Sequence, residues 1–544
     1  MPLNDKLRAD AAAKDLSPTD LILVCEMLFS RGRGDEAVRM AMNVGGKSDR
    51  ADLLFASATI MGSLASRHDI AAALFRKALH LLPRDNPQLV KLAADIKTSL
   101  ADTLMADGKV GEALSIYKEN LAEQPADGMS LCEHISMSLL EAGYPLEAAE
   151  VIRTWMKVGA SSPILLNNLG CALQRLNQSA EALPYYEKAV ALSPYHPDIS
   201  FGYAITLLKA GRIQEGLRLY SRRTPSMSTN NYWFLDLPRL TEEDELKGKR
   251  IVFYQEQGLG DTLQFVRYIP WVVSMGAEVV LAVPPQLFRL MQTSYPDVDV
   301  RLMTDFNTPK SSEDERVYHY GCPIPDLPYI ARVKAITEHD LARGEESEVP
   351  YLHVPDEITD RFSALCDLGI EKTGAVPDKR RLRIGIVWSG DRRKNAKDVA
   401  ADKRRSVTFD DLITALTPLD ADLFNLQFGD RRQDLAEWKG QPVIDLMSDV
   451  GDMLDTAALI KNLDMVVSVD TSVVHLAGAL GVPVWMISRW DACWRWGDRG
   501  ETSPWYPTIK IFRANGLSFG PVLSQVGEAL KDTIALNDAE PLGV

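Results

Sequence analysis

The chain has 544 residues, too many for one ordinary hydrophobic core, which indicates two to four domains. Its formal net charge of −15 disfavours general affinity for nucleic acid or an anionic membrane, so any phosphate site must be local. No apolar run is long enough to cross a bilayer, the N-terminus lacks the apolar core of a signal peptide, and the six scattered cysteines form no CxxC pair. We therefore expect a cytoplasmic protein with neither a disulfide framework nor a zinc site.

A repeated helix-turn-helix pattern occupies residues 1–225. Small residues recur at spacings of 34, 42, 35, 34 and 34, where two helices would touch: Ala37, Ala71, Ala113, Ala148, Ala182 and Gly216. This pattern resembles the tetratricopeptide repeat over roughly residues 15–225, with Ala37 marking a degenerate first unit. The resemblance implies an all-α superhelix whose concave face binds an extended peptide or a protein surface. The alternatives are that the array supports the second half or mediates self-association.

The helical pattern ends near Arg222, and the polar connector 226–248 follows, with Tyr232, Trp233 and Phe234 expected to pack partly. Strands such as "RIVFYQ" and "AEVVLAV" then alternate with helices, including one helix over "TLQFVRYIPWVVSMG", which is typical of parallel βαβ units. We expect two Rossmann-like domains facing each other across a cleft, at 249–345 and 382–544, joined by the charged linker 346–381. Ligands of such sheets bind beyond the carboxyl ends of the strands.

The turn "EQGLGD" follows the strand expected at 251–254. Gly258 and Gly260 allow a tight turn and a close approach of the backbone, but the third glycine of a dinucleotide fingerprint is missing. Asp261 falls near the start of the next helix, where its side chain could serve as an N-cap. In a cleft, the same carboxylate could instead be a general base that accepts the proton of an attacking hydroxyl.

The stretch "VVSVDTSVVHLAGALG" predicts a buried strand, a turn and a helix. Asp470, Thr471 and Ser472 could cap this helix. The same hydroxyls and free backbone N–H groups would also form an anion site, suited to a diphosphate or a nucleotide monophosphate. His475 lies one turn further along, either as a core residue with one hydrogen bond or as part of that site.

A third strand end, in "VWSGDRRKNAKDVAADKRRS", carries Trp388, Ser389 and Gly390. Seven cations follow within fourteen residues, a local attractor for phosphate or carboxylate in an acidic chain: Arg392, Arg393, Lys394, Lys397, Lys403, Arg404 and Arg405. We expect Arg405 to point inward. The alternative is a solvated charged loop.

Aromatic residues crowd into the last unusual stretch, which contains Trp490, Trp494, Trp496, Trp505 and Tyr506. They could form a platform for a base or a sugar ring, or they could pack between domains. Asp420 and Asp422 match the letters of a DxD metal pair, but they precede a strand instead of following one. We therefore expect no metal.

Taken together, residues 255–512 resemble bacterial glycosyltransferases of the GT-B fold related to the heptosyltransferases, which are commonly fused to tetratricopeptide repeats. The matching pieces are, in order, "EQGLGDTLQFVRY", "VWSG", "RRS", "DTAALI", "VSVDTSVVHLAGALGVPVW", "WRW" and "SPWYPT". The resemblance implies that Asp261 is the catalytic base on the acceptor side and that 382–544 binds the donor. The implied donor-binding set is Gly258, Gly260, Trp388, Ser389, Gly390, Arg405, Gln427, Asp470, Thr471, Ser472, His475, Trp494 and Trp496, with no cofactor besides the nucleotide sugar.

Chains that combine these repeats with this domain resemble flagellin glycosyltransferases of alphaproteobacteria, which transfer nonulosonic acids such as pseudaminic acid from CMP-sugars to Ser or Thr. The leading hypothesis is therefore a cytoplasmic, metal-independent protein O-glycosyltransferase whose repeats hold the acceptor protein, flagellin. Two alternatives stay open: a transferase acting on lipopolysaccharide or another glycan, and a non-catalytic repeat scaffold or flagellin-binding chaperone. Neither a nucleic-acid partner nor a membrane span is expected.

Overall fold

The computed structural model describes residues 17–83, 89–123, 128–157, 161–224, 232–308, 317–334, 348–375, 377, 381–390, 402, 404–417, 419–516 and 518–539. The chain divides into two compact units, Met1–Leu169 and Gly170–Val544. The boundary falls within helix α10 (Pro163–Arg175), so the last repeat helices belong to the same unit as both β-sheets.

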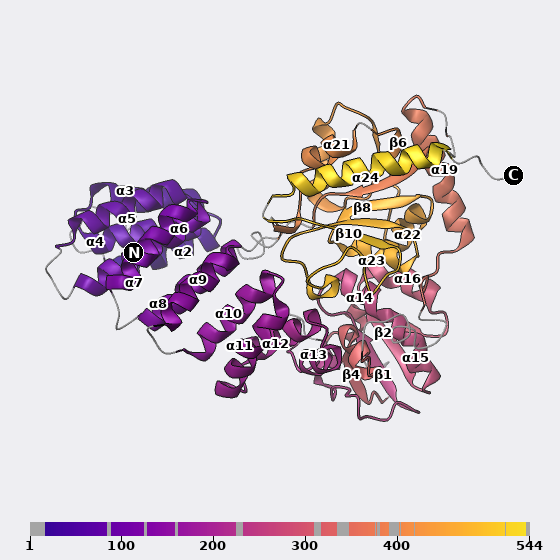
Figure 1. The fold of residues 1–544 in the computed structure, drawn as a ribbon, viewed down its shortest axis with the longest axis horizontal. Coiled ribbons are helices and arrows are strands. Elements are labelled where there is room, and N and C mark those ends of the chain that lie inside the picture. The colour runs from indigo at the N-terminus through magenta and orange to yellow at the C-terminus, as the bar shows by residue number, and fades with distance from the viewer. Residues whose placement is uncertain are drawn as a thin grey trace. The chain divides into compact units, whose positions relative to one another are not determined.

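The first unit is an array of helical hairpins (Figure 1). Its helices are α2 (Pro18–Ser30), α3 (Gly34–Lys47), α4 (Ala51–Thr59) with the π-helical turn η1 (Ile60–Leu64), α5 (His68–Leu81), α6 (Val90–Ala106), α7 (Val110–Glu123), α8 (Gly128–Ala142) and α9 (Pro145–Met156). Ala37, Ala71, Ala113 and Ala148 are fully buried in the second helix of successive hairpins, as the repeat pattern predicts. The first repeat, which contains Ala37 and was expected to be degenerate, is a regular hairpin in which α2 packs on α3.

The repeats continue into the second unit as α11 (Ser179–Leu192), α12 (Pro197–Lys209) and α13 (Ile213–Tyr220). The Tyr186 ring lies between two glycines of neighbouring helices: a Cβ on Gly170 would lie 2.6 Å from the ring, and one on Gly202 would lie 2.8 Å from its hydroxyl. Glycine at both positions therefore lets the helices approach each other across this ring.

The first of two parallel sheets has the strand order β3-β2-β1-β4. Its strands are β1 (Arg250–Tyr254), β2 (Glu278–Val283), β3 (Asp299–Leu302) and β4 (Tyr320–Pro323), with α16 (Pro285–Ser294) between β2 and β3. The single helix predicted after β1 is wrong, because the chain forms α14 (Leu259–Phe265), the 3-10 turn η4 (Val266–Tyr268) and α15 (Ile269–Ser274) instead. Pro270 has no N–H to continue the helical hydrogen bonds, which explains the break.

The second sheet has six strands in the order β10-β9-β8-β5-β6-β7, all paired in parallel. They are β5 (Leu382–Val387), β6 (Ala421–Asn425), β7 (Val443–Ile444), β8 (Met465–Val469), β9 (Val484–Ser488) and β10 (Ile509–Arg513). The longer helices of this half are α19 (Asp356–Lys372), α21 (Phe409–Leu416), α22 (Met453–Lys461), α23 (Ser472–Ala479) and α24 (Gly520–Ala539), the last lying across the sheet in Figure 1. All residues of β8 are buried, as expected for a parallel strand covered on both faces.

Short helical turns complete the second unit: η3 (Trp233–Asp236), η5 (Met303–Phe306), η6 (Ile324–Asp326), α17 (Leu327–Ile330), η8 (Gly429–Glu437) and η9 (Trp494–Trp496). Trp233 and Phe234 are buried against the first sheet, which confirms the expected packing of the connector. All six cysteines are free thiols. In the part of the chain that the structure describes, no helix is both long and apolar enough to cross a membrane.

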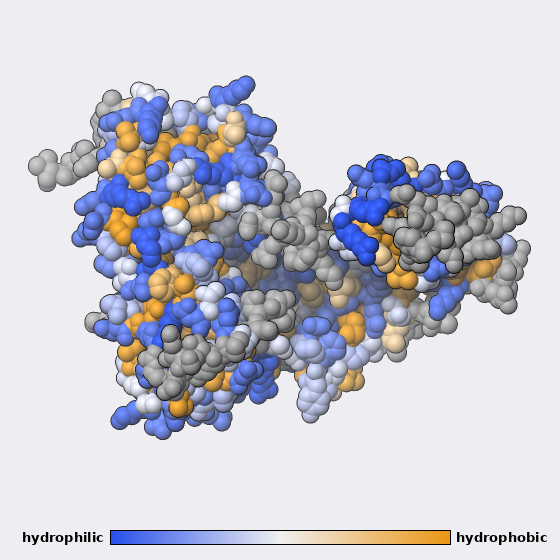
Figure 2. All heavy atoms as spheres, turned by 180° about the vertical axis from the view of Figure 1, so that it is seen from behind, coloured by the Kyte–Doolittle hydropathy of each residue, from blue (hydrophilic) through white to orange (hydrophobic). Residues whose placement is uncertain are grey.

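The surface seen in Figure 2 has apolar and hydrophilic residues interspersed. Large apolar side chains are exposed on many elements of both units, for example Met42 on α3, Leu368 on α19 and Leu536 on α24. Scattered exposed apolar residues of this kind are normal at protein surfaces.

A glycine substitution tests the repeat packing. Gly170→Ala should destabilise the protein by about 1–3 kcal/mol, because the new Cβ would force the buried Tyr186 ring, which also lies against Gly202, to shift. Gly111→Ala is the matched control, since nothing lies within 4 Å of its Cβ and alanine favours a helix. Thermal unfolding followed by circular dichroism compares them, and an unchanged Gly170→Ala variant would contradict the packing argument.

Candidate functional site

The turns that follow β1 and β8 meet at one place. Helix α14 follows β1, helix α23 follows β8, and the two helices pack on each other. Their contact is so close that a Cβ on Gly260 would lie 2.6 Å from His475 Cδ2. Tyr351 of the interdomain linker ties both sides together: its N–H donates to Ala479 O (3.1 Å) and its hydroxyl donates to Leu263 O (2.9 Å). The carboxyl ends of two strands from different sheets therefore form one site.

Asp261 is held by groups from both halves of the second unit. Gly258 is the N-cap residue of α14, and its N–H donates to Asp261 Oδ2 (2.9 Å), so Asp261 closes the turn from the third helical position and is not the N-cap. The Arg495 guanidinium contacts Asp261 Oδ1, and Arg495 Nε donates to Gln264 Oε1 (2.7 Å). The Asp261 side chain keeps 16% of its surface exposed, so it remains open to a small group.

Arg495 is a residue of the candidate site that sequence reasoning did not single out. It lies in η9 between Trp494 and Trp496, and its ring neighbours are Trp494 (4.6 Å to the centroid) and Phe265 (5.5 Å). Burial alone would lower its pKa, but Asp261 raises the pKa above the usual arginine value. The only sequence signal is a cation between two tryptophans, which does not indicate its partner.

The turn at the start of α23 lies within the electrostatic reach of three guanidinium groups. Thr471 is the N-cap residue, but its side chain makes no capping hydrogen bond; its hydroxyl lies 3.2 Å from Ser468 Oγ. Burial raises the pKa of Asp470, while Arg489, Arg495 and Arg405 act in the opposite direction. Three guanidinium groups thus act on this turn electrostatically, where the first N–H groups of α23 have no intrahelical acceptor. This is the arrangement of an anion site.

His475 is buried and neutral. Its Nδ1 lies 3.0 Å from the Tyr506 hydroxyl, and its ring stacks on Trp496 with centroids 5.4 Å apart. Burial, together with the nearby charges of Arg495 and Arg267, lowers its pKa to about 3. His475 is therefore an uncharged hydrogen-bonding group near neutral pH, both part of the core and adjacent to the glycine turn.

The loop after β5 is fixed by a neighbouring strand end. Gln427 Oε1 accepts hydrogen bonds from Trp388 N (3.2 Å) and Ser389 N (3.0 Å), and the Arg405 guanidinium lies directly against Gly390. The Trp388 ring is fully buried and donates to Asp434 Oδ2 (2.9 Å), so it packs in the core. Gln427 and Trp388 thus shape the loop, and Arg405 is a cation of this loop that acts electrostatically on Asp470. The cations Arg392, Arg393, Lys394, Lys397 and Lys403 lie outside the described residues.

The aromatic stretch is mostly packed inside. Trp494, Trp496, Trp505 and Tyr506 are buried, and both Trp494 and Trp505 contact Phe265 of α14 with ring centroids 6.5 and 5.7 Å apart. Since α14 belongs to the first sheet's half, these rings join the two halves. The structure therefore favours the packing interpretation over a ring platform for a ligand.

The repeats support the loop that carries Arg495. Ser179, at the start of α11, donates to Asp498 through its N–H (2.9 Å) and its hydroxyl (2.8 Å). Lys209 lies 3.4 Å from the same carboxylate, and burial lowers its pKa while Asp498 opposes that effect. Asn177, in the turn before α11, donates to Trp490 O (2.7 Å). Asp498 thus caps a repeat helix from the far end of the chain, which no local sequence signal could have indicated.

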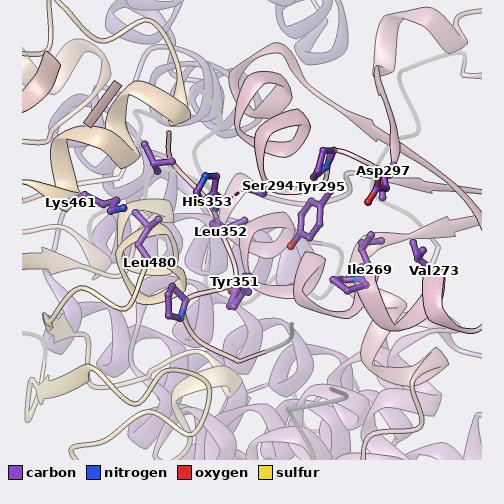
Figure 3. A pocket seen from close by; sticks show the side chains of 15 residues that line it. Ile269, Val273, Ser294, Tyr295, Asp297, Tyr351, Leu352, His353, Lys461 and Leu480 are labelled. Atoms are coloured by element: carbon purple, nitrogen blue, oxygen red, sulfur yellow. Dashed lines mark hydrogen bonds between the residues drawn. The ribbon is translucent and has the colours of Figure 1, made fainter. Parts of the chain in front are cut away.

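A separate pocket of about 510 Å³ lies at the linker (Figure 3). Its walls come from α15, the chain after α16, residues 350–354 and Leu480. His353 N donates to Ser294 Oγ (3.0 Å) at its rim. None of the predicted site residues lines it, so this pocket is distinct from the candidate site.

The acidic pair Asp420 and Asp422 is engaged by one cation. Arg381 contacts Asp420 at 2.6 Å and Asp422 at 2.7 Å. Within the described ranges, no group of three or more His, Cys, Asp or Glu side chains is placed to hold a metal ion.

Comparison with known proteins finds a repeat family for the first part of the chain and several similar proteins. A tetratricopeptide repeat family model matches residues 28–223, which confirms the predicted repeats there. Protein FlbA of Caulobacter vibrioides is 24% identical over 466 residues, spanning 75% of this chain and 74% of that protein. Similar solved structures include a glycosyl transferase family 9 protein from Veillonella parvula (12% identity, TM-score 0.33, 54% of this chain and 91% of that one). The ADP-heptose lps heptosyltransferase II of E. coli is another (13% identity, TM-score 0.34, 54% and 100%).

The buried His475 predicts a pH dependence of stability. Its folded pKa of about 3 lies below the usual histidine value near 6.5, so the unfolded chain takes up a proton that the folded chain does not. This stability is fully present above pH 6.5 and is lost as the pH falls toward 3, by about 1.4 kcal/mol per pH unit. His475→Gln removes this titration, so the wild type should lose stability more steeply than the variant between pH 6.5 and 4.5.

Chemical unfolding followed by tryptophan fluorescence measures this difference. Trp155 is the only tryptophan of the first unit, so the signal comes mainly from the second unit, which contains His475. Parallel stability curves for the wild type and His475→Gln would show that His475 is not held in its neutral form.

Proposed function

We propose that this protein is a glycosyltransferase that moves a sugar from a nucleotide sugar to a Ser or Thr hydroxyl of an acceptor protein. One observation carries the proposal: α14 packs on α23. The Asp261 carboxylate and the 470 turn, on which three guanidinium groups act, therefore belong to one site built from both halves. Transfer of a sugar away from a phosphate leaving group requires a base and an anion site. Here the two lie at facing strand ends.

The acceptor hydroxyl binds next to Asp261. Two of the contacts of this carboxylate are to Gly258 N–H and Arg495, which leaves further oxygen lone pairs for a hydroxyl proton. As the hydroxyl oxygen forms a bond to the anomeric carbon, its proton passes to Asp261. The bond from that carbon to the phosphate oxygen breaks, and the electron pair leaves with the nucleotide.

The donor phosphate binds at the start of α23. The free backbone N–H groups of Thr471, Ser472 and Val473 and the guanidiniums of Arg405, Arg489 and Arg495 stabilise the negative charge that develops on the leaving phosphate. When Tyr506 donates to Nδ1 of His475, Nε2 carries the proton and offers a neutral donor on the side of Gly260. Because guanidinium groups supply the positive charge, the proposed reaction is metal-independent.

The acceptor and donor follow from the resemblance of the sequence to flagellin glycosyltransferases. The proposed acceptor is flagellin, held by the repeats, and the proposed donor is a CMP-linked nonulosonic acid such as pseudaminic acid. Repeat arrays present extended surfaces for protein partners, which supports a protein acceptor.

A transfer assay tests the proposal. The full chain is incubated with CMP-, UDP-, GDP- and ADP-linked sugars and with flagellin or a lipopolysaccharide core as acceptor, and intact mass is measured. Flagellin should gain the mass of one or more nonulosonic acids from the CMP donor. Asp261→Asn should reduce kcat by about 10²–10³-fold while leaving donor affinity near wild type, because only the proton acceptor is lost.

Transfer to the glycan instead of flagellin would assign the protein to the heptosyltransferase type of reaction. If none of the donors gives transfer to either acceptor and flagellin still binds, the result would support the scaffold alternative.

Nucleotide binding tests the anion site on its own. Calorimetry with CMP, UDP, GDP and ADP should show binding of one nucleotide, and Arg405→Ala should weaken it about 10-fold, as expected for one lost charge-assisted contact to phosphate. Arg361→Ala is the control, since Arg361 lies on α19 and contacts Asp449 O, outside the candidate site. An unchanged Kd for Arg405→Ala would return Arg405 to the solvated-loop interpretation.

A further inference from the structure

The glycine turn that carries Asp261 contains a residue in an unfavourable backbone conformation. Gln257 has φ of +64°, in the left-handed region that residues other than glycine seldom adopt. Gly258 follows directly, and its N–H is the group that holds Asp261 Oδ2. A change in the backbone at 257 would therefore alter the position of the carboxylate. Such a conformation persists only where surrounding contacts impose it.

The contacts that impose it come from the last repeat helix. The Tyr220 hydroxyl, at the end of α13, donates to Gln257 Oε1 (3.0 Å), and Gln255 Nε2 donates to Gln257 O (2.7 Å). Tyr220 itself is buried and fixed: Arg223 donates to its carbonyl (2.9 Å) and its guanidinium lies 4.0 Å from the ring centroid. Burial raises the pKa of Tyr220 to about 12, so its hydroxyl stays protonated and can donate.

The neighbouring residue of the turn is tied to the same helix end. The Arg223 guanidinium contacts the buried Glu256 carboxylate. Two successive turn residues, Glu256 and Gln257, are therefore held from the end of α13, by Arg223 and Tyr220. Among the described residues, the side-chain donors to Gln257 are Tyr220 and Gln255, and only Tyr220 comes from outside the turn.

We propose that Tyr220 is a positioning residue for transfer: its hydroxyl holds Gln257 in the left-handed conformation and thereby sets the Gly258–Asp261 geometry. This inference rests on the proposed role of Asp261 as the base. It gives the repeats a part in the transfer step itself, in addition to holding the acceptor.

The Tyr220 ring and its hydroxyl have separable roles. The ring packs on Phe201 and Trp494, with centroids 5.9 and 6.2 Å apart, and belongs to the core. Tyr220→Phe keeps this packing and removes only the donor to Gln257. A glycine at 257 would need no support, because it adopts positive φ without the steric cost. The effect of Tyr220→Phe should therefore vanish when Gln257→Gly is also present.

The experiment uses the full chain and two readouts. Hydrogen exchange followed by mass spectrometry should show faster exchange of the peptide that covers residues 255–261 in Tyr220→Phe than in the wild type. In the transfer assay, kcat should fall about 10-fold with the donor Kd unchanged, because the phosphate site is not touched. Tyr203→Phe is the matched control: Tyr203 lies on α12 of the same repeat, and its hydroxyl is 3.4 Å from Glu187, away from the turn.

Adding Tyr220→Phe to Gln257→Gly should cause no further loss of kcat. Equal exchange in Tyr220→Phe and the wild type overturns the inference, as does an additive loss in the double variant or an unchanged kcat in Tyr220→Phe. If the wild type transfers no sugar, the proposed function fails, and the exchange measurement alone then decides whether the hydroxyl holds the turn.

Discussion

The arrangement of the second unit depends on one buried ionic cluster. Arg223, just after the last repeat helix, contacts Glu256 and Asp326, and Arg239 of the connector contacts Asp326 as well at 2.6 Å. Burial alone would lower the pKa of Arg223, but Asp326 and its other neighbours raise it. An unpaired charge buried here would be costly, so repeat, connector and sheet must be in place together. The cluster lies directly beside the glycine turn, which links the constraint on folding to the candidate site.

A second constraint is steric and acts between the two halves. Gly260 and His475 can touch only because position 260 has no side chain, and Tyr351 of the linker bonds to the backbone on both sides of that contact. Phe265, Trp494 and Trp505 fill the adjoining space. The close approach brings the carboxylate and the anion site within one small volume. The same packing removes the tryptophan rings from solvent, which is why an aromatic-rich loop here is structural.

Local patterns in the sequence predicted most of the fold, because helix pairs and parallel strands leave periodic signals over ten or more residues. The buried alanines of the repeats and the strand after Asp464 are examples. Pro270 was also visible, yet the helix over it was predicted as continuous, since apolar periodicity persists through the break. For the site, glycine turns and strand ends located Asp261 and the 470 turn. Arg495, Tyr220 and Asp498 could not be found this way, because their partners lie 234, 37 and 319 residues away.

The capping of α11 by Asp498 has a consequence for modular design. Because a carboxylate beyond β9 serves as the capping group of a repeat helix, the two parts of this chain do not separate at the polar connector where their sequence textures change. A chimaera that exchanges the repeats between related chains would have to join them upstream of Gly170, keeping α11–α13 with the unit that contains the sheets. The structural unit that such a chimaera must keep whole is thus longer than the α/β region alone and includes the last repeat helices.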